Sequence, residues 1–532
     1  MSLELLLSPA PFGSRVLRVD PTGASGYSTL SSALAAITDA STTNEYLIIV
    51  AGEIAETAAI AAKSHVNVVF LAGASVTVTS TSTLNAVNMT SITNSVWATV
   101  DPSKPHIIRA GAVSGGAHVL STSSLGNTVR LSGLNALNST TGGANCHGIY
   151  NSVSSPTMTN CTGVGGGGAT CYGIVNEVSS PIMTNCTGVG GGGATCYGIY
   201  NFDGSNPVMT TCTGTGGAGG TACYGIYNSS SSPTMTDCTG TGGGGGTTCY
   251  GIYNSSSSPT MTDCTGTGGG GGTDCHGILN NASSSPTMTD CTGTGGGGAV
   301  ACHGILNNAS SSPTMTDCTG TGGGVPIKST TATIPATTRQ DDSFRPSATI
   351  PYRLLVASIN VTAAAAAGVT LTLRDATGGV GNALSGTIAV DSSGVKTFPV
   401  TGNRVIATAG YIYGRLSASD SALAYTVTYS YETCFTSCNA LYQDTDSPCD
   451  ILDPQFVSNA ASDATIVTAN GILRTVFDGG SARSGRNDGT RMKAMNCVAA
   501  WNPGQVYNMV LDGGSTNLTA AVGVANGSNI ER

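Results

Sequence analysis

Apolar positions in the middle of the chain recur with a fixed period. Between residues 146 and 324, Ile, Met and Cys return every 25 to 27 residues within runs of Thr, Ser and Gly. The isoleucines are Ile149, Ile174, Ile199, Ile226, Ile252, Ile278 and Ile305. The methionines are Met158, Met183, Met209, Met235, Met261, Met288 and Met315. Self-similarity at this period is typical of a solenoid, in which stacked coils bury apolar side chains that one coil could not bury alone.

Each repeat predicts three short strands. They are the runs CYGIYN, PTMT and CTGTG, separated by a serine turn, a bend at Asp or Asn, and a glycine corner. Proline opens the strand that carries Met, where its missing N–H does least harm. The prediction is a parallel β-helix with Ile and Met in its core. Strand alternation leaves one conflict, because an inward Ile places the Cys three residues earlier on the outside unless a bulge intervenes.

The N-terminal part predicts an arm at residues 1–20 and a degenerate start of the same solenoid at residues 21–145. The run STLSSALAAIT predicts a short amphipathic helix behind a Ser/Thr cap. Its apolar face would hold Leu30, Ala33, Leu34 and Ile37. Strands are expected at residues 46–50, 66–71 and 76–78. The helix would cover the open end of the first coil, as the terminal unit of a repeat array must.

Several stretches resemble a known superfamily. VLRVDPTGASGYSTLSSALAAI, NEYLIIVAGEI and HVNVVFLAGASVTV resemble the beginning of right-handed parallel β-helices of the pectin-lyase-like superfamily. The GIYNSSSSPTMTDC coils are similar to right-handed β-helix repeats of surface and phage proteins. The resemblance covers residues 15 to 324 and implies the fold. The Asp-Asp and Gly-His-Gly constellations of polygalacturonases are missing, and the repeats lack the basic residue that pectate lyases use.

The pattern changes after the last repeat. From Lys328, apolar and polar residues alternate, with turn signals every 8 to 12 residues, which predicts a β-sandwich or jelly-roll-like module at residues 325–433. This part resembles the terminal jelly-roll modules of phage tail fibres and carbohydrate-binding domains. The regular repeats thus span residues 146–324. Residues 434–532, with Cys434, Cys438, Cys449 and Cys497, are expected to form a small C-terminal unit of unknown class.

Charge argues against a nucleic-acid partner, and the lack of a long apolar run argues against a membrane span. The net charge is −9, and no Lys or Arg lies between Arg130 and Lys328. Nucleic acids are bound through a basic surface, so we expect no nucleic-acid partner. No stretch has the roughly 18 apolar residues that a membrane span needs. The start MSLELLLSPAPFGSRV lacks the basic residues and long apolar run of a secretory signal, so export by that route is not expected.

The repeats contain fourteen of the 18 cysteines, in two series. One series is Cys146, Cys171, Cys196, Cys223, Cys249, Cys275 and Cys302, and the other is Cys161, Cys186, Cys212, Cys238, Cys264, Cys291 and Cys318. A disulfide across each glycine corner, such as Cys161 to Cys171, fits the spacing. We favour stacks of reduced thiols that act as small apolar groups, because no export signal indicates an oxidising route. Stacked coils place identical ligands in a line and not in a tetrahedron, so we expect no metal and no cofactor.

A row of aspartates is the candidate catalytic set: Asp237, Asp263, Asp290 and Asp317. Coils stack about 4.8 Å apart, so these carboxylates would lie near the separation used by retaining glycosidases. The alternative is that Asp accommodates a left-handed bend between strands. We favour the bend, because Asn160, Asn185 and Thr211 occupy the same place in earlier coils.

An aromatic position is the candidate glycan-binding set: Tyr172, Tyr197, Tyr224 and Tyr250, with His147, His276 and His303 in the equivalent place. These rings could stack on sugars, or they could stack on one another along the coil axis, which we favour. The histidines have no paired carboxylate or nucleophile in their coils and are not a catalytic set.

These features lead to a functional hypothesis. We expect a phage tailspike or tail fibre, made in the host cytoplasm and carried on the virion tail, that recognises a host surface polysaccharide during adsorption. Its partners would be that glycan, other tail proteins and two further copies of itself, because similar spikes are trimers and all-glycine corners allow close approach. The alternatives are a β-helical polysaccharide hydrolase or lyase, and an extracellular adhesin or ice-binding solenoid. Near-identical coils favour binding over catalysis, and a regular Thr-x-Thr array would favour ice.

Overall fold

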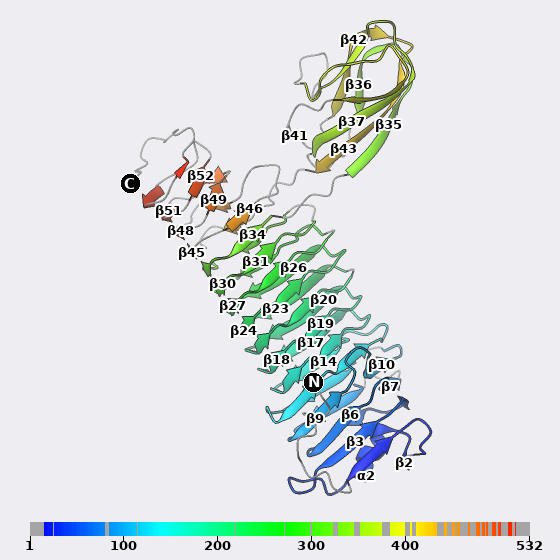
Figure 1. Cartoon of the computed structure of the whole chain (residues 1–532), viewed down its shortest axis with the longest axis vertical. Helices are drawn as coiled ribbons and strands as arrows, with labels where there is room; N and C mark the ends of the chain where they lie inside the picture. Colours follow the sequence, from blue (N-terminus) through cyan, green and yellow to red (C-terminus); the bar gives the residue numbers. More distant parts are fainter. Residues whose placement is uncertain are drawn as a thin grey trace. The chain divides into compact units, whose positions relative to one another are not determined.

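In the computed structural model, each sequence repeat forms one coil, and equivalent residues of successive repeats lie side by side in adjacent coils (Figure 1). The structure describes residues 15–433, with gaps at 25, 80–84, 114, 219, 271, 298–300, 323–327, 345–351, 375–382, 399–404 and 407–410, and short strands between 441 and 517. The chain divides into a β-helical unit and a second unit within residues 324–437.

Three parallel sheets form the β-helix, and each regular coil adds one strand to each sheet. Sheet 1 holds β1 (Val16–Val19), β3 (Tyr46–Val50), β6 (Val66–Phe70), β9 (Ser95–Thr99), β12 (Val129–Ser132), β15 (Thr157–Thr159), β18 (Ile182–Thr184), β21 (Val208–Thr210), β24 (Thr234–Thr236), β27 (Thr260–Thr262), β30 (Thr287–Thr289) and β33 (Thr314–Thr316). Sheet 2 holds β4 (Glu53–Glu56), β7 (Ser75–Thr79), β10 (Ile107–Ala110), β13 (Asn135–Asn138), β16 (Thr162–Val164), β19 (Thr187–Val189), β22 (Thr213–Thr215), β25 (Thr239–Thr241), β28 (Thr265–Thr267), β31 (Thr292–Thr294) and β34 (Thr319–Thr321). Sheet 3 holds β5 (Ile60–Ala61), β8 (Val87–Thr90), β11 (Leu120–Ser123), β14 (Ile149–Ser152), β17 (Thr170–Glu177), β20 (Thr195–Phe202), β23 (Ala222–Ser229), β26 (Thr248–Ser255), β29 (Ile278–Asn281) and β32 (Ile305–Asn307). The predicted parallel β-helix is confirmed.

The core is built from the predicted apolar rows. Every repeat Ile and Met is fully buried, and equivalent residues of adjacent coils are in register, as in Met235 with Met261. Each coil therefore buries its apolar side chains against identical ones above and below it, which a single coil could not do.

A row of buried asparagines was not predicted. In the first six regular coils, an Asn two residues after the core Ile donates its side-chain amide to the Asn of the next coil, at 2.7 to 2.9 Å. The amide nitrogen of the last, Asn307, is buried without a hydrogen-bond partner among the described residues. The row is Asn151, Asn176, Asn201, Asn228, Asn254, Asn280 and Asn307, all fully buried. Thr122 donates to Asn151 at the start of this ladder. A buried amide without partners would be costly, and stacking identical coils supplies the partner automatically.

A glycine in sheet 3 resolves the conflict over strand alternation. In β17, Tyr172 and Ile174 pair with Tyr197 and Ile199, while Gly173 between them has no partner in the register. Cys171 and Ile174 can therefore both face inward. A Cβ on Gly163 would lie 2.2 Å from the carbonyl oxygen of Gly173, so the two backbones meet there and only glycine fits.

The repeat cysteines are buried thiols, as favoured from the sequence. The Cys161 series lies in the main core, and the Cys171 series lies beneath the glycine corner. There, the N–H of Gly168 donates to Sγ of Cys171 at 3.1 Å, and burial raises the pKa of that thiol to about 12. The alternative disulfide between Cys161 and Cys171 is not formed, and the contact of Gly163 with Gly173 lies between the two series.

The N-terminal end is closed as predicted. Helix α2 (Leu30–Ala36) starts at Thr29, whose side chain accepts the N–H of Ser32, and it buries Leu30, Ala33 and Leu34. The predicted arm was wrong in its last residues, because β1 pairs in parallel with β3 and so belongs to the solenoid. Residues 1–14 lie outside the described residues.

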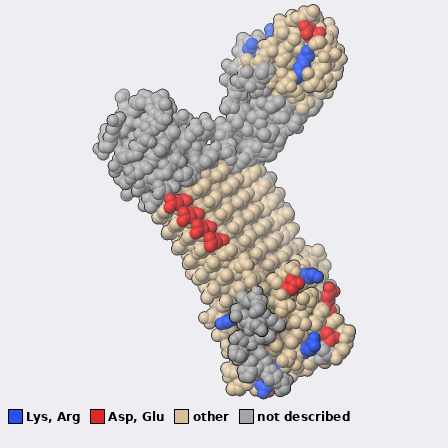
Figure 2. Space-filling view, viewed as in Figure 1, with Lys and Arg blue, Asp and Glu red and all other residues tan. Residues whose placement is uncertain are grey.

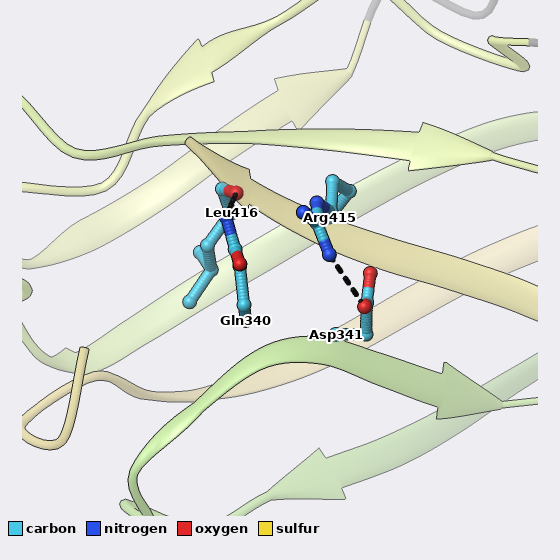
Figure 3. A network of polar contacts seen from close by, with 4 residues as sticks. All are labelled: Gln340, Asp341, Arg415 and Leu416. Atoms are coloured by element: carbon cyan, nitrogen blue, oxygen red, sulfur yellow. Dashed lines mark hydrogen bonds and ion pairs between the residues drawn. The ribbon is translucent and has the colours of Figure 1, made fainter. Parts of the chain in front are cut away.

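The second unit is a sandwich of two antiparallel sheets, as predicted. One sheet holds β35 (Lys328–Ile334), β43 (Ala424–Thr433), β37 (Tyr352–Ala363), β40 (Gly394–Phe398) and β41 (Val405–Ile406). The other holds β36 (Arg339–Phe344), β42 (Ile412–Asp420), β38 (Thr370–Arg374) and β39 (Ile388–Ala389). Arg415 forms an ion pair with Asp341 at 2.6 Å, and Gln340 donates to the carbonyl oxygen of Leu416 at 3.4 Å (Figure 3). Both contacts join β36 to β42.

The β-helix resumes after the sandwich, so the prediction of a separate unit at residues 434–532 was wrong. Strands β44 (Leu441–Gln443), β45 (Cys449–Leu452) and β46 (Gln455–Val457) pair in parallel with β32, β33 and β34 of the last repeat. Further coils follow through β47 (Ile466–Thr468), β48 (Thr475–Asp478), β49 (Ser481–Ser484), β50 (Arg486–Asn487), β51 (Met492–Met495), β52 (Val498–Trp501), β53 (Met509–Asp512) and β54 (Thr516–Asn517). These coils lack the regular spacing of Ile, Met and Cys, so the sequence pattern did not predict them. The side chains of the four C-terminal cysteines lie outside the described residues.

Among the described residues, no helix has the length and apolar character needed to cross a membrane.

Candidate functional site

Two columns of aromatic rings run along sheet 3. The histidine–tyrosine column consists of His118, His147, Tyr172, Tyr197, Tyr224, Tyr250, His276 and His303. The tyrosine column beside it contains Tyr200, Tyr227 and Tyr253, with Tyr150 near its start. The unpaired glycine of each strand shifts the alternation, so both aromatic positions of CYGIYN lie on the outer face while Cys, Ile and Asn face inward.

The rings cover one another. Tyr172 and Tyr197 stack with centroids 4.7 Å apart, and Tyr227 and Tyr253 stack at 4.6 Å with planes 4° from parallel. The columns also touch each other, as in Tyr197 and Tyr227 at 5.6 Å. Such offset stacking stabilises the rings beyond their buried area. The neighbouring coils cover the faces of the tyrosine rings, so no sugar ring can lie flat on them. A partly exposed tyrosine therefore presents only its ring edge and its hydroxyl to a ligand.

Four of the tyrosine hydroxyls, those of Tyr172, Tyr197, Tyr200 and Tyr224, stay protonated. Burial raises the pKa of Tyr200 and of Tyr224 to about 12, and it also raises the pKa of Tyr172 and Tyr197. These groups therefore act as neutral donors and acceptors at any physiological pH. The hydroxyl of Tyr253 accepts from the amide of Asn281 at 3.0 Å, which leaves its own proton available to donate.

His118, His147 and His276 in this column are neutral at neutral pH. His147, His276 and His303 are almost fully buried, and His276 stacks on His303 at 5.0 Å. Burial lowers the pKa of His118 to about 4 and holds the pKa of His147 and His276 well below 6.5. Residues 131–327 also contain no Lys or Arg, so the repeats carry no permanent positive charge.

The aspartate row lies on another part of the solenoid. Asp237, Asp263, Asp290 and Asp317 are exposed at the bend between sheets 1 and 2, with φ between 51° and 53°. The equivalent Asn160, Asn185 and Thr211 have the same left-handed backbone (φ 52° to 54°), so the bend alone accounts for a short polar residue here. Figure 2 shows the row on an otherwise uncharged stretch of surface.

The structure does not bring the two candidate sets together. The aspartates follow sheet 1, and the tyrosines lie on sheet 3. Within the described residues, no group of three or more His, Cys, Asp or Glu side chains is placed to hold a metal ion. A catalytic role for the aspartates therefore stays a prediction.

Sequence reasoning missed the tyrosine column and the asparagine ladder. The sequence signal for the column was present in CYGIYN, where a second aromatic residue lies three positions after the first. Regular alternation assigns these two positions to opposite faces. Only the unpaired glycine between them puts both on the outside.

The chain matches no protein-family model and no curated protein sequence. Similar solved structures include the tailspike protein gp49 of Acinetobacter baumannii bacteriophage Fri1, a capsular polysaccharide depolymerase (10% identity, 80% of this chain, 87% of that chain, TM-score 0.29). They also include the enzymatically active domain of bacteriophage CBA120 tailspike protein 4 (11%, 79%, 68%, TM-score 0.25) and the tailspike of Acinetobacter baumannii phage AM24 (9%, 77%, 81%, TM-score 0.15). All three are phage tailspikes. At these identities and TM-scores the likeness carries no activity over to this chain, so its function is argued from its own residues.

Proposed function

We propose that the protein is a phage tailspike or tail fibre that binds a host surface polysaccharide through the outer face of sheet 3. The observation that carries this proposal is the pair of stacked aromatic columns on that face. Stacking fixes each ring before a ligand arrives, so little side-chain entropy is lost when the hydroxyls form hydrogen bonds. The protein would be made in the host cytoplasm and act on the virion tail.

The columns suit an extended, repetitive ligand. Each coil offers similar hydroxyl groups about 4.8 Å after the last, so a polysaccharide lying along the solenoid meets the same contacts repeatedly. Weak individual hydrogen bonds then add up through multivalency. Ser229 and Ser255, which follow the tyrosine column on the same face, add further neutral donors.

Charge narrows the class of glycan. Residues 131–327 contain seven acidic side chains and no Lys or Arg, and burial keeps His147 and His276 neutral. An anionic polysaccharide would meet no Lys or Arg along the regular repeats. The preferred ligand is therefore an uncharged polysaccharide or one that carries free amines.

Binding without cleavage is the simpler activity for this surface. The aspartates lie on a different edge from the tyrosines, and Asn or Thr replaces them in the earlier coils. A glycan held on sheet 3 would therefore not reach them.

Assembly into trimers, together with attachment to other tail proteins, completes the proposal. Most corner glycines are required by close contacts within the same chain, because a Cβ on Gly191 or Gly217 would collide with the backbone of the preceding coil. Gly192, Gly244 and Gly270 differ, because a Cβ there would have no contact closer than 3.9 Å. These exposed positions leave a smooth edge between sheets 2 and 3 on which a second copy could pack.

The experiment uses the full chain and a panel of purified bacterial polysaccharides that are neutral, anionic or amine-bearing. Titration calorimetry should detect binding to members of the neutral or amine-bearing groups, and sizing of the glycan afterwards should show no shortening. Light scattering should give the mass of a trimer. Binding confined to anionic polysaccharides, or no binding to any member, would contradict the proposal.

A further inference from the structure

The outer faces of sheets 1 and 2 carry a regular array of threonines. In each of the seven regular coils, the strand of sheet 1 and the strand of sheet 2 each place two residues outside, around an inward Met or Gly. Of these 28 positions, 24 are Thr, and the other four are Val164, Ile182, Val189 and Val208. Every side chain in the array is therefore β-branched and uncharged.

The array is periodic in two directions. Equivalent threonines of adjacent coils are in register, as in Thr236 with Thr262 and Thr239 with Thr265. The repeat is about 4.8 Å along the solenoid and about 6.6 Å along a strand. A β-branched side chain has few χ1 rotamers, so methyl and hydroxyl groups hold fixed places. Coil stacking keeps these sheets flatter than an open sheet.

The fold alone does not explain this uniformity. On sheet 3 of the same coils, the outward position that ends the strand is Glu177, Phe202, Ser229, Ser255 or Asn281. The outward residue at this position of sheet 3 therefore varies among the coils, whereas the outward residues of sheets 1 and 2 are β-branched and uncharged in every coil. Exposed protein surfaces ordinarily carry charged residues that keep molecules apart in solution, and this array has none.

We propose that these two faces bind the surface of ice. An ice surface is flat, uncharged and periodic in two dimensions, and its oxygen spacings are close to the two repeats of the threonine array. Hydroxyl groups at fixed places can join that lattice while the methyl groups between them exclude liquid water. A rigid array loses little conformational entropy on binding. A single polysaccharide chain would use only one of the two periodic directions.

This activity is independent of glycan binding, because it uses sheets 1 and 2 and leaves sheet 3 untouched. The exposed aspartates at the bend separate the two faces and project from the edge that they share. Each face is continuous over the seven coils, so two matched surfaces are available on one shaft.

The test measures the gap between the melting and freezing temperatures of a seed crystal, together with inhibition of ice recrystallisation, in solutions of the full chain. The paired change Thr236→Lys with Thr262→Lys places long charged side chains on sheet 1, and Thr239→Lys with Thr265→Lys does so on sheet 2. Each pair should lower the activity, and all four changes together should abolish it. Thr262→Val keeps the shape and should retain most of it. Ser229→Lys with Ser255→Lys adds the same charge to sheet 3, where it is expected to weaken glycan binding, and should leave the effect on ice unchanged.

Each variant is first checked for the circular dichroism and melting temperature of the parent, since all the changes are on outward side chains. No effect of the full chain on ice, or activity that survives the four lysines, would overturn the proposal. Retention on crystalline cellulose without any effect on ice would assign the faces to a solid polysaccharide and would overturn it as well. Glycan binding in solution is measured separately, so either function can fail alone.

Discussion

Tyr227 and Tyr253 lie face to face one coil apart, with ring centroids 4.6 Å apart and planes 4° from parallel. The same contact recurs along the solenoid because the coils are in register. The stack stabilises the shaft and also fixes where each hydroxyl points. Replacements that keep the ring therefore separate the structural part of the column from its part in binding.

The paired change Tyr227→Phe with Tyr253→Phe should weaken glycan binding and leave the melting temperature nearly unchanged. The rings still stack, but two hydroxyls are lost, at about 1 kcal/mol for each hydrogen bond. Calorimetry of the full chain with the polysaccharide it binds measures the loss, and Tyr→Ala at the same positions should lower stability as well. Equal affinity of the Phe variant and the parent would remove the hydroxyls from the binding role.

The change Met235→Asp should destabilise the β-helix by about 4 kcal/mol, because it opens a cavity and buries a charge without a partner. Met235 is fully buried between Met209 and Met261. Thr236→Asp, one residue later on the outer face, is the matched control and should cost little. Thermal unfolding followed by circular dichroism compares the two, and similar melting temperatures would contradict the assigned register.

The change Asn228→Leu should also destabilise the protein, although Leu is similar in size and more apolar. It removes the oxygen that accepts from the amide of Asn201 and the amide that donates to the oxygen of Asn254, at about 1–3 kcal/mol for each lost hydrogen bond. Thr236→Val, which removes a hydroxyl from the surface, serves as control. A stabilised Asn228→Leu variant would show that the ladder is not required for stability.

Alkylation should distinguish buried thiols from disulfides. In the native protein few of the fourteen repeat cysteines should react, because all are buried and burial raises the pKa of thiols such as Cys171. After denaturation without reductant, mass spectrometry should find every one of them labelled. Unlabelled pairs, each 2 Da lighter than two thiols, would mean that disulfides form.

Acid should weaken the fold because the buried histidines gain protons more readily in the unfolded chain. Burial holds the pKa of His147 and His276 well below their ordinary value of 6.5. Between those values the unfolded chain binds more protons than the folded one, so stability falls as the pH drops below about 6.5. The melting temperature should therefore decrease from pH 7 to pH 5. His276→Tyr, which copies Tyr250 one coil earlier, should reduce this dependence, and an unchanged pH profile would contradict the assignment.

The sequence by itself determined the repeating part of the molecule. The regular spacing of Ile and Met specified the coil, its core and its parallel stacking. Each repeat contacts only its neighbours, so the repeat length alone is enough to pair equivalent residues. The capped helix over residues 30–36 was equally local, since Thr29 and an apolar face suffice to define it. The left-handed bends at Asp237 and its equivalents also followed from residue type.

Only the tertiary structure decided which of these positions face outward together. An unpaired glycine such as Gly173 moves both aromatic residues of a strand to the outer face, and its backbone contact with Gly163 cannot be read from either residue alone. The return of the chain from the sandwich to the β-helix was hidden for a similar reason. Strands β44 to β46 pair with the last repeat through backbone hydrogen bonds, which need no repeated side chain to signal them. Side-chain periodicity therefore predicts the core, whereas backbone pairing and close approach decide the surface and the path of the chain.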